Sequence, residues 1–199
     1  MSEFKKINLL EFLNRENIFL AIVLILFLII IIKMIPPIPI TMGKNIKMSI
    51  LKQNGTITNI DTQRNISSKM EMWINTINFN DGQELIHKDL GPLGYNSYFF
   101  LDFDFNIKVK IPGYYDFIIY SDDGFRLFIN SNVVCEYISD RPISNTTGQI
   151  FLDRGIYKVY LTYFQGYGLL GLRAYYHPVN SKYMYLFGKN SKYIEFLKP

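Results

Sequence analysis

One long apolar run near the amino terminus is the strongest feature of the hydrophobic pattern. Residues 18–32 read IFLAIVLILFLIIII, and Lys33, Met34 and Ile35 follow. At about 1.5 Å of rise per residue, a helix over residues 18–35 spans roughly 27 Å, close to a hydrocarbon core of about 30 Å. The alternatives are a buried core helix and a cleaved signal peptide, but no small-residue cleavage site follows the run. The pattern predicts one uncleaved transmembrane helix, anchored by residues that include Ile18, Phe19, Leu20, Leu24, Leu28 and Ile32.

The segments that flank this run predict how the chain is oriented. Residues 1–17 form a short tail, and residues 36–47 form a stem stiffened by Pro36, Pro37 and Pro39. Basic residues occur on both sides of the run, but long folded parts are translocated largely regardless of their charge. We therefore expect a cytoplasmic tail, a single pass through a bacterial inner membrane and a carboxy-terminal domain in the periplasm. A stem that reaches at most about 40 Å keeps this domain close to its membrane.

The rest of the chain carries the period-two pattern of β-strands. Residues 102–111 read DFDFNIKVKI, with an apolar face that runs from Phe103 to Ile111 and a polar face between. Pro112-Gly113 breaks this strand, a second apolar segment follows, and Asp122-Asp123-Gly124 is a strong signal for a hairpin turn. Further short strands, separated by turns, are expected up to Tyr176. The pattern predicts an all-β antiparallel sandwich or barrel.

Composition narrows the possible chemistry. The chain has 199 residues, 16% of them aromatic, and its formal net charge of +4 is scattered rather than clustered, which argues against a nucleic-acid partner. A single cysteine, Cys135, excludes an internal disulfide and reads as a small buried hydrophobe. Asp102 and Asp104 share a strand face with lysines, which favours a solvated charged face over a catalytic pair. No acid, base and nucleophile can be assembled, so we expect no enzyme and no catalytic residue.

Three blocks resemble a known family. Residues 113–130 (GYYDFIIYSDDGFRLFIN), 148–157 (GQIFLDRGIY) and 163–166 (YFQG) look like the protective-antigen-type (PA-fourteen) β-sandwich domain in order and in spacing. The resemblance covers about residues 48–178 and leaves residues 179–199 as a carboxy-terminal extension. It implies a domain used in adhesins, carbohydrate-active enzymes and toxins for binding or assembly. The extension is expected either to add an edge strand to its own sheet or to pair with a partner.

The resemblance also implies a metal site. In the carbohydrate-binding members of the family, aspartates equivalent to Asp122 and Asp123 hold a Ca²⁺ that contacts sugar hydroxyls, helped by an Asn and by backbone carbonyls from a later loop. The later loop here has no Asn, although Gln165 offers an amide oxygen, Asp140 lies in another loop, and Tyr167 could stack on a sugar. Turn formation is the competing explanation of the two aspartates, because Asp side chains bond nearby backbone amides. Both explanations remain open at this point.

Two functions follow from these observations. The first is a non-enzymatic, membrane-anchored scaffold that docks on protein partners in an envelope-spanning assembly, for example the accessory structure of a flagellar motor or a secretion system. The second is a calcium-dependent module that binds wall glycan. The short stem, the incomplete calcium loop and the extension favour the first.

Overall fold

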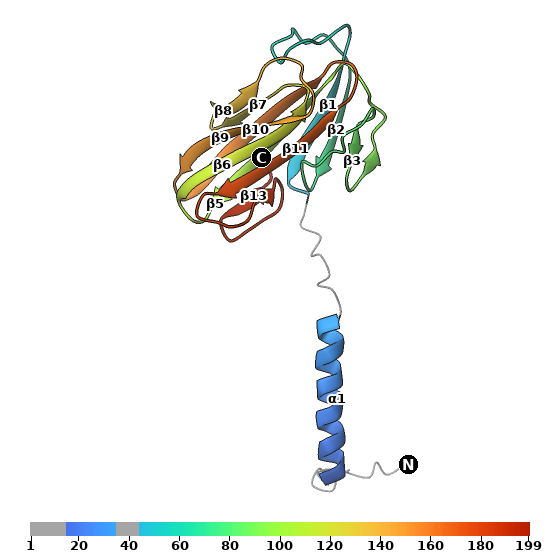
Figure 1. Cartoon of the computed structure of the whole chain (residues 1–199), viewed down its shortest axis with the longest axis vertical. Helices are drawn as coiled ribbons and strands as arrows, with labels where there is room; N and C mark the ends of the chain where they lie inside the picture. The colour runs from blue at the N-terminus through green and yellow to red at the C-terminus, as the bar shows by residue number, and fades with distance from the viewer. Residues whose placement is uncertain (1–14, 35–43) are drawn as a thin grey trace, which may run out of the picture. The chain divides into compact units, whose positions relative to one another are not determined.

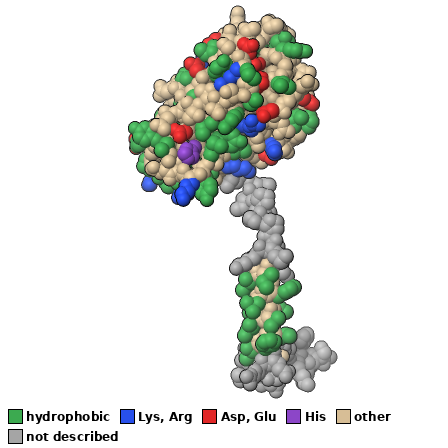
Figure 2. Space-filling view, viewed as in Figure 1, with side chains coloured by type: hydrophobic (Ala, Val, Ile, Leu, Met, Phe, Trp, Pro, Cys, Tyr) green, Lys and Arg blue, Asp and Glu red, His purple; other side chains and the backbone are tan. Residues whose placement is uncertain are grey.

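An apolar helix begins the part of the chain that we describe. The computed structural model describes residues 15–34 and 44–199, and within the helix it describes the side chains of residues 17–30. Helix α1 (Arg15–Met34) covers the apolar run, and Figure 2 shows hydrophobic side chains along its described part. Within the described residues, no helix is long and apolar enough to cross a membrane, so the predicted transmembrane anchor finds no support in the structure. Most of the predicted tail and stem lies outside the described residues, as does the side chain of Ile32.

The chain divides into two compact units, residues 1–41 and residues 42–199. The described residues of the second unit form a β-sandwich. Two antiparallel sheets lie face to face (Figure 1). The larger sheet has the order β2-β1-β5-β10-β7-β8, with β13 also on β5, and the smaller has the order β12-β11-β6-β9. The strands of the larger sheet are β1 (Ile46–Gln53), β2 (Ile66–Ile74), β5 (Phe99–Val109), β7 (Phe125–Ile129), β8 (Asn132–Tyr137), β10 (Gly155–Gln165) and β13 (Ile194–Leu197). Those of the smaller are β6 (Gly113–Asp122), β9 (Ser144–Leu152), β11 (Gly171–Pro178) and β12 (Tyr185–Leu186), and β3 (Ile86–His87) pairs with β4 (Gly91–Pro92).

The core lies where the predicted apolar faces meet. The inward side chains of β5, which include Phe103 and Phe105, are fully buried, as the alternation predicts. Ile111 is the exception, because β5 ends at Val109 and Ile111 is 41% exposed in the turn before β6. Cys135 is buried, as expected of a small hydrophobe, and burial raises the pKa of its thiol to about 12.

The carboxy-terminal segment is part of the larger sheet. Strand β13 pairs antiparallel with β5, with Ile194 opposite Val109 and Phe196 opposite Ile107. Along the same edge of β5, β1 occupies the residues from Phe99 to Asp104. Of the two uses expected for the extension, the structure therefore shows an additional strand on the chain's own sheet.

Candidate functional site

Three loops meet at the turn between β6 and β7, around Asp122 and Asp123. The two residues are joined by a cis peptide bond, and both are buried, with 8% and 5% of their surfaces exposed. Asp123 Oδ1 accepts a hydrogen bond from the Arg141 amide at 3.2 Å, and Asp123 Oδ2 accepts one from the Gly166 amide at 2.8 Å. Asp123 thus ties the β8–β9 loop and the β10–β11 loop to the turn.

Arg141 places a positive charge that acts on Asp122, and its backbone N–H bonds to Asp123. Its guanidinium lies 4.3 Å from the centre of the Tyr137 ring, and it donates to Ser121 Oγ and to Thr146 Oγ1, each at 2.8 Å. These contacts fix the side chain against β6, β8 and β9. Burial raises the pKa of Asp122 and the charge of Arg141 opposes that rise, while burial lowers the pKa of Arg141 itself.

Burial dominates the titration of the two aspartates. Desolvation, followed by the neighbouring charge of Asp123, raises the pKa of Asp122 to about 6. Desolvation also raises the pKa of Asp123, and its bonds to the Gly166 and Arg141 amides oppose that shift. More distant carboxylates contribute as well: Asp81 acts on Asp122, and Asp140 acts on Asp123. The folded chain therefore holds an acidic pair whose ionisation is costly near neutral pH.

Gln165 is used inside the protein rather than for a ligand. It is fully buried, its Oε1 lies 2.5 Å from the Tyr163 hydroxyl, and its Nε2 donates to the Leu169 carbonyl at 2.9 Å. The Tyr163 hydroxyl also contacts the carbonyl oxygen of Asp122, and burial raises the pKa of that phenol well above its usual value. Gln165 therefore stabilises the β10–β11 loop through both ends of its amide.

The residues around Asp122 and Asp123 do not fit Ca²⁺, which takes about six to eight oxygen ligands. The β10–β11 loop turns the N–H of Gly166 toward Asp123 and its carbonyl toward the Tyr98 amide, so a donor rather than an oxygen faces the carboxylate. The amide of Gln165 is already bonded at both ends. Over residues 15–34 and 44–199, no three His, Cys, Asp or Glu side chains are grouped so as to hold a metal ion.

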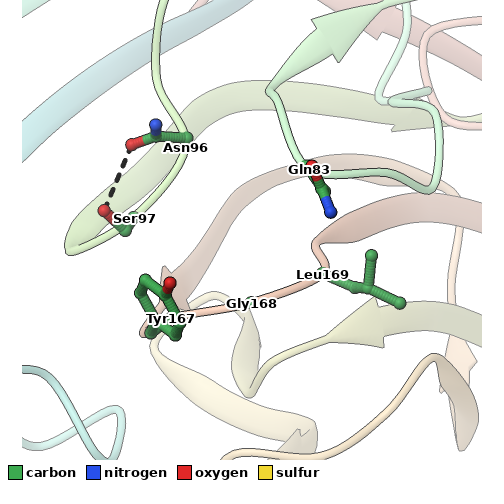
Figure 3. Close-up of a pocket in the computed structure, with 6 residues that line it drawn as sticks. All are labelled: Gln83, Asn96, Ser97, Tyr167, Gly168 and Leu169. Carbon is green, nitrogen blue, oxygen red and sulfur yellow. Dashed lines mark hydrogen bonds between the residues drawn. The ribbon is translucent and has the colours of Figure 1, made fainter.

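A pocket of about 340 Å³ is lined in part by the β10–β11 loop (Figure 3). It is lined by Gln83, Asn96, Ser97, Tyr167, Gly168 and Leu169. The Tyr167 ring stands at its rim with 84% of the residue exposed, and the Ser97 hydroxyl lies 3.1 Å from Asn96 Oδ1. Neither Asp122 nor Asp123 lines the pocket, although Gly166 connects the two places through its bond to Asp123.

The structure divides the residues predicted from the sequence into two places. Asp122, Asp123, Gln165 and the nearby Asp140 belong to the acidic turn, whereas Tyr167 belongs to the pocket. Sequence reasoning missed the remaining parts, namely Gln83, Asn96, Ser97, Arg141 and Tyr163. The first four lie in loops, and no regular spacing in the sequence identifies them as parts of a site. The fifth, Tyr163, sits in an alternating strand that looks like ordinary core.

The carboxylates considered for catalysis make structural contacts, and so does His87. Asp102 accepts two hydrogen bonds from Arg64, at 2.6 and 3.0 Å, and Asp104 lies 3.6 Å from Lys158. His87 is buried, with Nε2 2.8 Å from the Thr76 carbonyl. These contacts agree with the prediction of a charged strand face.

Comparison with solved structures identifies the class of fold. The chain matches the "PA14 domain of MpAFP Antifreeze protein" with a TM-score of 0.63 and 12% identity, over 78% of this chain and 91% of that one. It matches the "PA14 sugar-binding domain from RTX adhesin" with a TM-score of 0.57 and 16% identity, over 72% of this chain and 94% of that one. It matches "Epithelial Adhesin 9 A domain (Epa9A) from Candida glabrata in complex with Galb1-3GlcNAc" with a TM-score of 0.57 and 12% identity, over 77% and 88%. No protein-family model and no curated protein matches the sequence significantly. The chain has a PA14-type β-sandwich fold, which confirms the fold that the three sequence blocks predict.

Proposed function

We propose that this chain is a non-enzymatic binding module that takes a carbohydrate into the pocket beside Tyr167, without calcium. The observation that carries the proposal is the composition of the pocket wall. Gln83, Asn96 and Ser97 supply amide and hydroxyl groups that can pair with sugar hydroxyls, and Tyr167 supplies an exposed ring. A ring that presents an apolar face and a polar edge suits the C–H face of a pyranose. A volume of about 340 Å³ accommodates a small saccharide unit.

The loop that carries Tyr167 is held in place before any ligand binds. Gly166 donates to Asp123, and its carbonyl accepts from the Tyr98 amide at 2.8 Å. The Tyr98 and Tyr167 rings are stacked with centroids 6.5 Å apart. A fixed loop lowers the ordering cost of binding, which supports a binding role for this end of the sandwich. Two of the similar structures, a sugar-binding domain and a domain in complex with Galb1-3GlcNAc, support carbohydrate as the ligand class.

Replacing the exposed ring tests this proposal. Tyr167→Ala should weaken binding to wall-glycan fragments by about tenfold or more, because the stacking surface is lost. The control is Tyr183→Ala, since Tyr183 is also largely exposed, at 70%, but lies outside this pocket. Binding is measured by calorimetry with the full-length chain in detergent. Equal affinities for the wild type and Tyr167→Ala would contradict the proposal.

The location that we propose rests on the sequence of α1. An apolar run over residues 18–32 and a short proline-containing stem would hold the domain at the outer face of a bacterial inner membrane, within reach of wall glycan. In the described part of α1, the hydrophobic side chains from Ile18 to Ile30 are exposed around the helix, which favours an apolar environment for it.

Docking on proteins of a membrane-associated assembly, such as a flagellar motor or a secretion system, is a second candidate function. The observation that favours it is a long exposed sheet edge, formed by β2. Purification of the full-length chain from its native membrane in mild detergent, followed by mass spectrometry, tests it. A stoichiometric set of protein partners that survives a calcium chelator would support this function, and recovery of the chain alone would contradict it.

A further inference from the structure

Strand β2 is a long sheet edge with one free side. It runs from Ile66 to Ile74, and among the described residues it pairs only with β1. All residues from Ser67 to Glu71 are exposed. At the opposite side of the sandwich the edges are covered instead, because β8 and β9 lie against each other: a Cβ on Gly148 would come within 2.3 Å of the Val134 carbonyl oxygen. An uncovered edge of this length is a template for pairing with another strand.

The backbone groups that point outward from β2 follow from the bonds of its neighbour. At the end of β1, the Gln53 amide donates toward β5, to Tyr98, and the next amide, Asn54, donates toward β2, to Asn65. The register shift between Lys52 and Gln53 adds Ser67 to β2 and leaves β1 regular, so the alternation continues along β1 and its even-numbered residues bond to β2. Their partners Met70 and Met72 therefore bond inward. Lys69 and Glu71, which lie between, direct their N–H and C=O groups away from the sheet.

The side chains on this edge are complementary to a second copy of themselves. Lys69 and Glu71 flank Met70 on the same strand, and in one chain their charged groups lie 2.7 Å apart. If two β2 strands pair antiparallel with Met70 opposite Met70, each Lys69 lies opposite the Glu71 of the other copy. Met70 is 42% exposed, so the same arrangement also buries two apolar side chains near the centre.

We propose that this chain forms a symmetric homodimer in which the β2 strands of two copies pair antiparallel about a two-fold axis at Met70. The pairing extends the larger sheet across both copies, and the outward backbone groups of Lys69 and Glu71 bond to each other. A two-fold interface presents the same surface from both copies, as this edge does. The dimer goes beyond the proposed carbohydrate function and does not depend on it, because the pocket and β2 share no residue.

Charge selects this register over its neighbours. A lysine on an edge strand often prevents pairing, because it would meet a like charge or be desolvated. A shift of the second copy by two residues in one direction places Glu71 opposite Glu71, and a shift in the other direction places Lys69 opposite Lys69. Only the arrangement centred on Met70 gives two attractive pairs, since cross-strand neighbours of opposite charge stabilise and those of like charge destabilise.

Charge reversal tests the dimer. Lys69→Glu alone and Glu71→Lys alone each place like charges opposite each other twice, and each should raise the dimer dissociation constant about tenfold. The double variant Lys69→Glu/Glu71→Lys restores both attractive pairs and should return to within about twofold of the wild type. An equimolar mixture of the two single variants should form a heterodimer, because one copy then carries two glutamates and the other two lysines. Lys182→Glu, a reversal in an exposed loop outside β2, is the matched control.

The measurement is sedimentation equilibrium of the full-length chain in detergent, with circular dichroism to verify that each variant is folded. Association through α1 would be insensitive to these reversals, so the pattern across variants separates the two causes. Weakening by both single variants, rescue in the double variant and heterodimer formation in the mixture would establish the interface. A wild type that remains monomeric up to high micromolar concentration, or a dimer of equal affinity in all variants, would overturn it.

Discussion

At the scale of single residues, the acidic turn holds neighbouring loops together. Asp123 accepts hydrogen bonds from the amides of two loops, and Arg141 fills the space beside Ser121 and Tyr137. Buried carboxylates that accept backbone N–H bonds contribute order, and the charge of Arg141 partly offsets the desolvation of Asp122. Asp123, which a calcium site would use, thus stabilises the arrangement of the loops through its hydrogen bonds.

Asp122 should make the fold less stable at neutral pH than at mildly acidic pH. Its pKa is about 6 in the folded chain, above the value of 3.8 that it has without the fold. Ionisation is therefore disfavoured by the fold; the cost is fully present above the folded pKa and disappears as the pH falls to the unfolded pKa. We expect Asp122→Asn to raise the free energy of unfolding at pH 7 by about 2 kcal/mol, since two pKa units correspond to somewhat more than that.

Urea unfolding from about pH 4 to pH 7 measures this effect. The difference between Asp122→Asn and the wild type should shrink as the pH falls from 6 toward 4. The exposed Asp153→Asn variant is the control and should differ little from the wild type at any of these pH values. A difference in the free energy of unfolding that stays constant with pH would show that burial does not raise the pKa of Asp122.

Sequence reasoning works for residues whose role is local and fails for those whose role is tertiary. The Asp-Gly pair at Asp123 and Gly124 predicts a turn from the chain itself, and the turn is present between β6 and β7. The pairing of Asp123 with Arg141 and Gly166 depends on how three loops meet, and no periodicity encodes that. Asn96 and Ser97 likewise acquire a place in the pocket only through the fold.

At the scale of elements, alternation predicts strands well and strand ends less well. The pattern over residues 102–111 gives the buried face of β5, but Ile111 lies beyond the end of that strand and is exposed. The sequence leaves two uses of the carboxy-terminal extension, residues 179–199, open. The pairing of β13 with β5 shows that the extension adds a strand to the chain's own sheet. β13 pairs with the part of β5 that β1 leaves unpaired, from Asn106 to Val109. A sequence pattern does not reveal that this part is free.

Strand β13 should be essential for stability rather than a loose tail. Phe196 is 2% exposed, and its ring centroid lies 5.6 Å from that of Phe105 and 6.0 Å from that of Phe187. Phe196→Ala should lower the free energy of unfolding by about 3–5 kcal/mol, because a large cavity opens in the core. Denaturant unfolding measures this loss, with the exposed Tyr183→Ala as control. Equal stability of Phe196→Ala and the wild type would mean that β13 does not pack as described.

At the scale of the whole molecule, the PA14-type fold offers no arrangement that fits calcium among residues 44–199. We therefore expect millimolar Ca²⁺ to leave the thermal unfolding midpoint within about 1 °C of its value in chelator. An ion present at about a hundred times its dissociation constant would instead stabilise the folded chain by roughly 2.7 kcal/mol. Differential scanning fluorimetry distinguishes these outcomes. A rise of several degrees that Asp123→Ala abolishes would show that the site does bind calcium.

The membrane attachment that we propose is also tested on the whole chain. The proposed anchor predicts that the full-length protein stays with the membrane after alkaline carbonate extraction. Leu24→Lys/Leu28→Lys should release it, because two lysines near the centre of the run cost roughly 5–7 kcal/mol on insertion scales. Immunoblots of the extracted and pelleted fractions report the result. Release of the wild type under the same conditions would contradict the anchor.

Calcium-independent binding of carbohydrate in the pocket beside Tyr167 is the central claim. The most direct measurement applies the full-length chain and Tyr167→Ala to an array of bacterial wall-glycan fragments, with a calcium chelator present throughout. We expect binding by the wild type in chelator and a signal reduced by about tenfold for Tyr167→Ala. Binding that appears only when calcium is added, or that Tyr167→Ala retains in full, would contradict it.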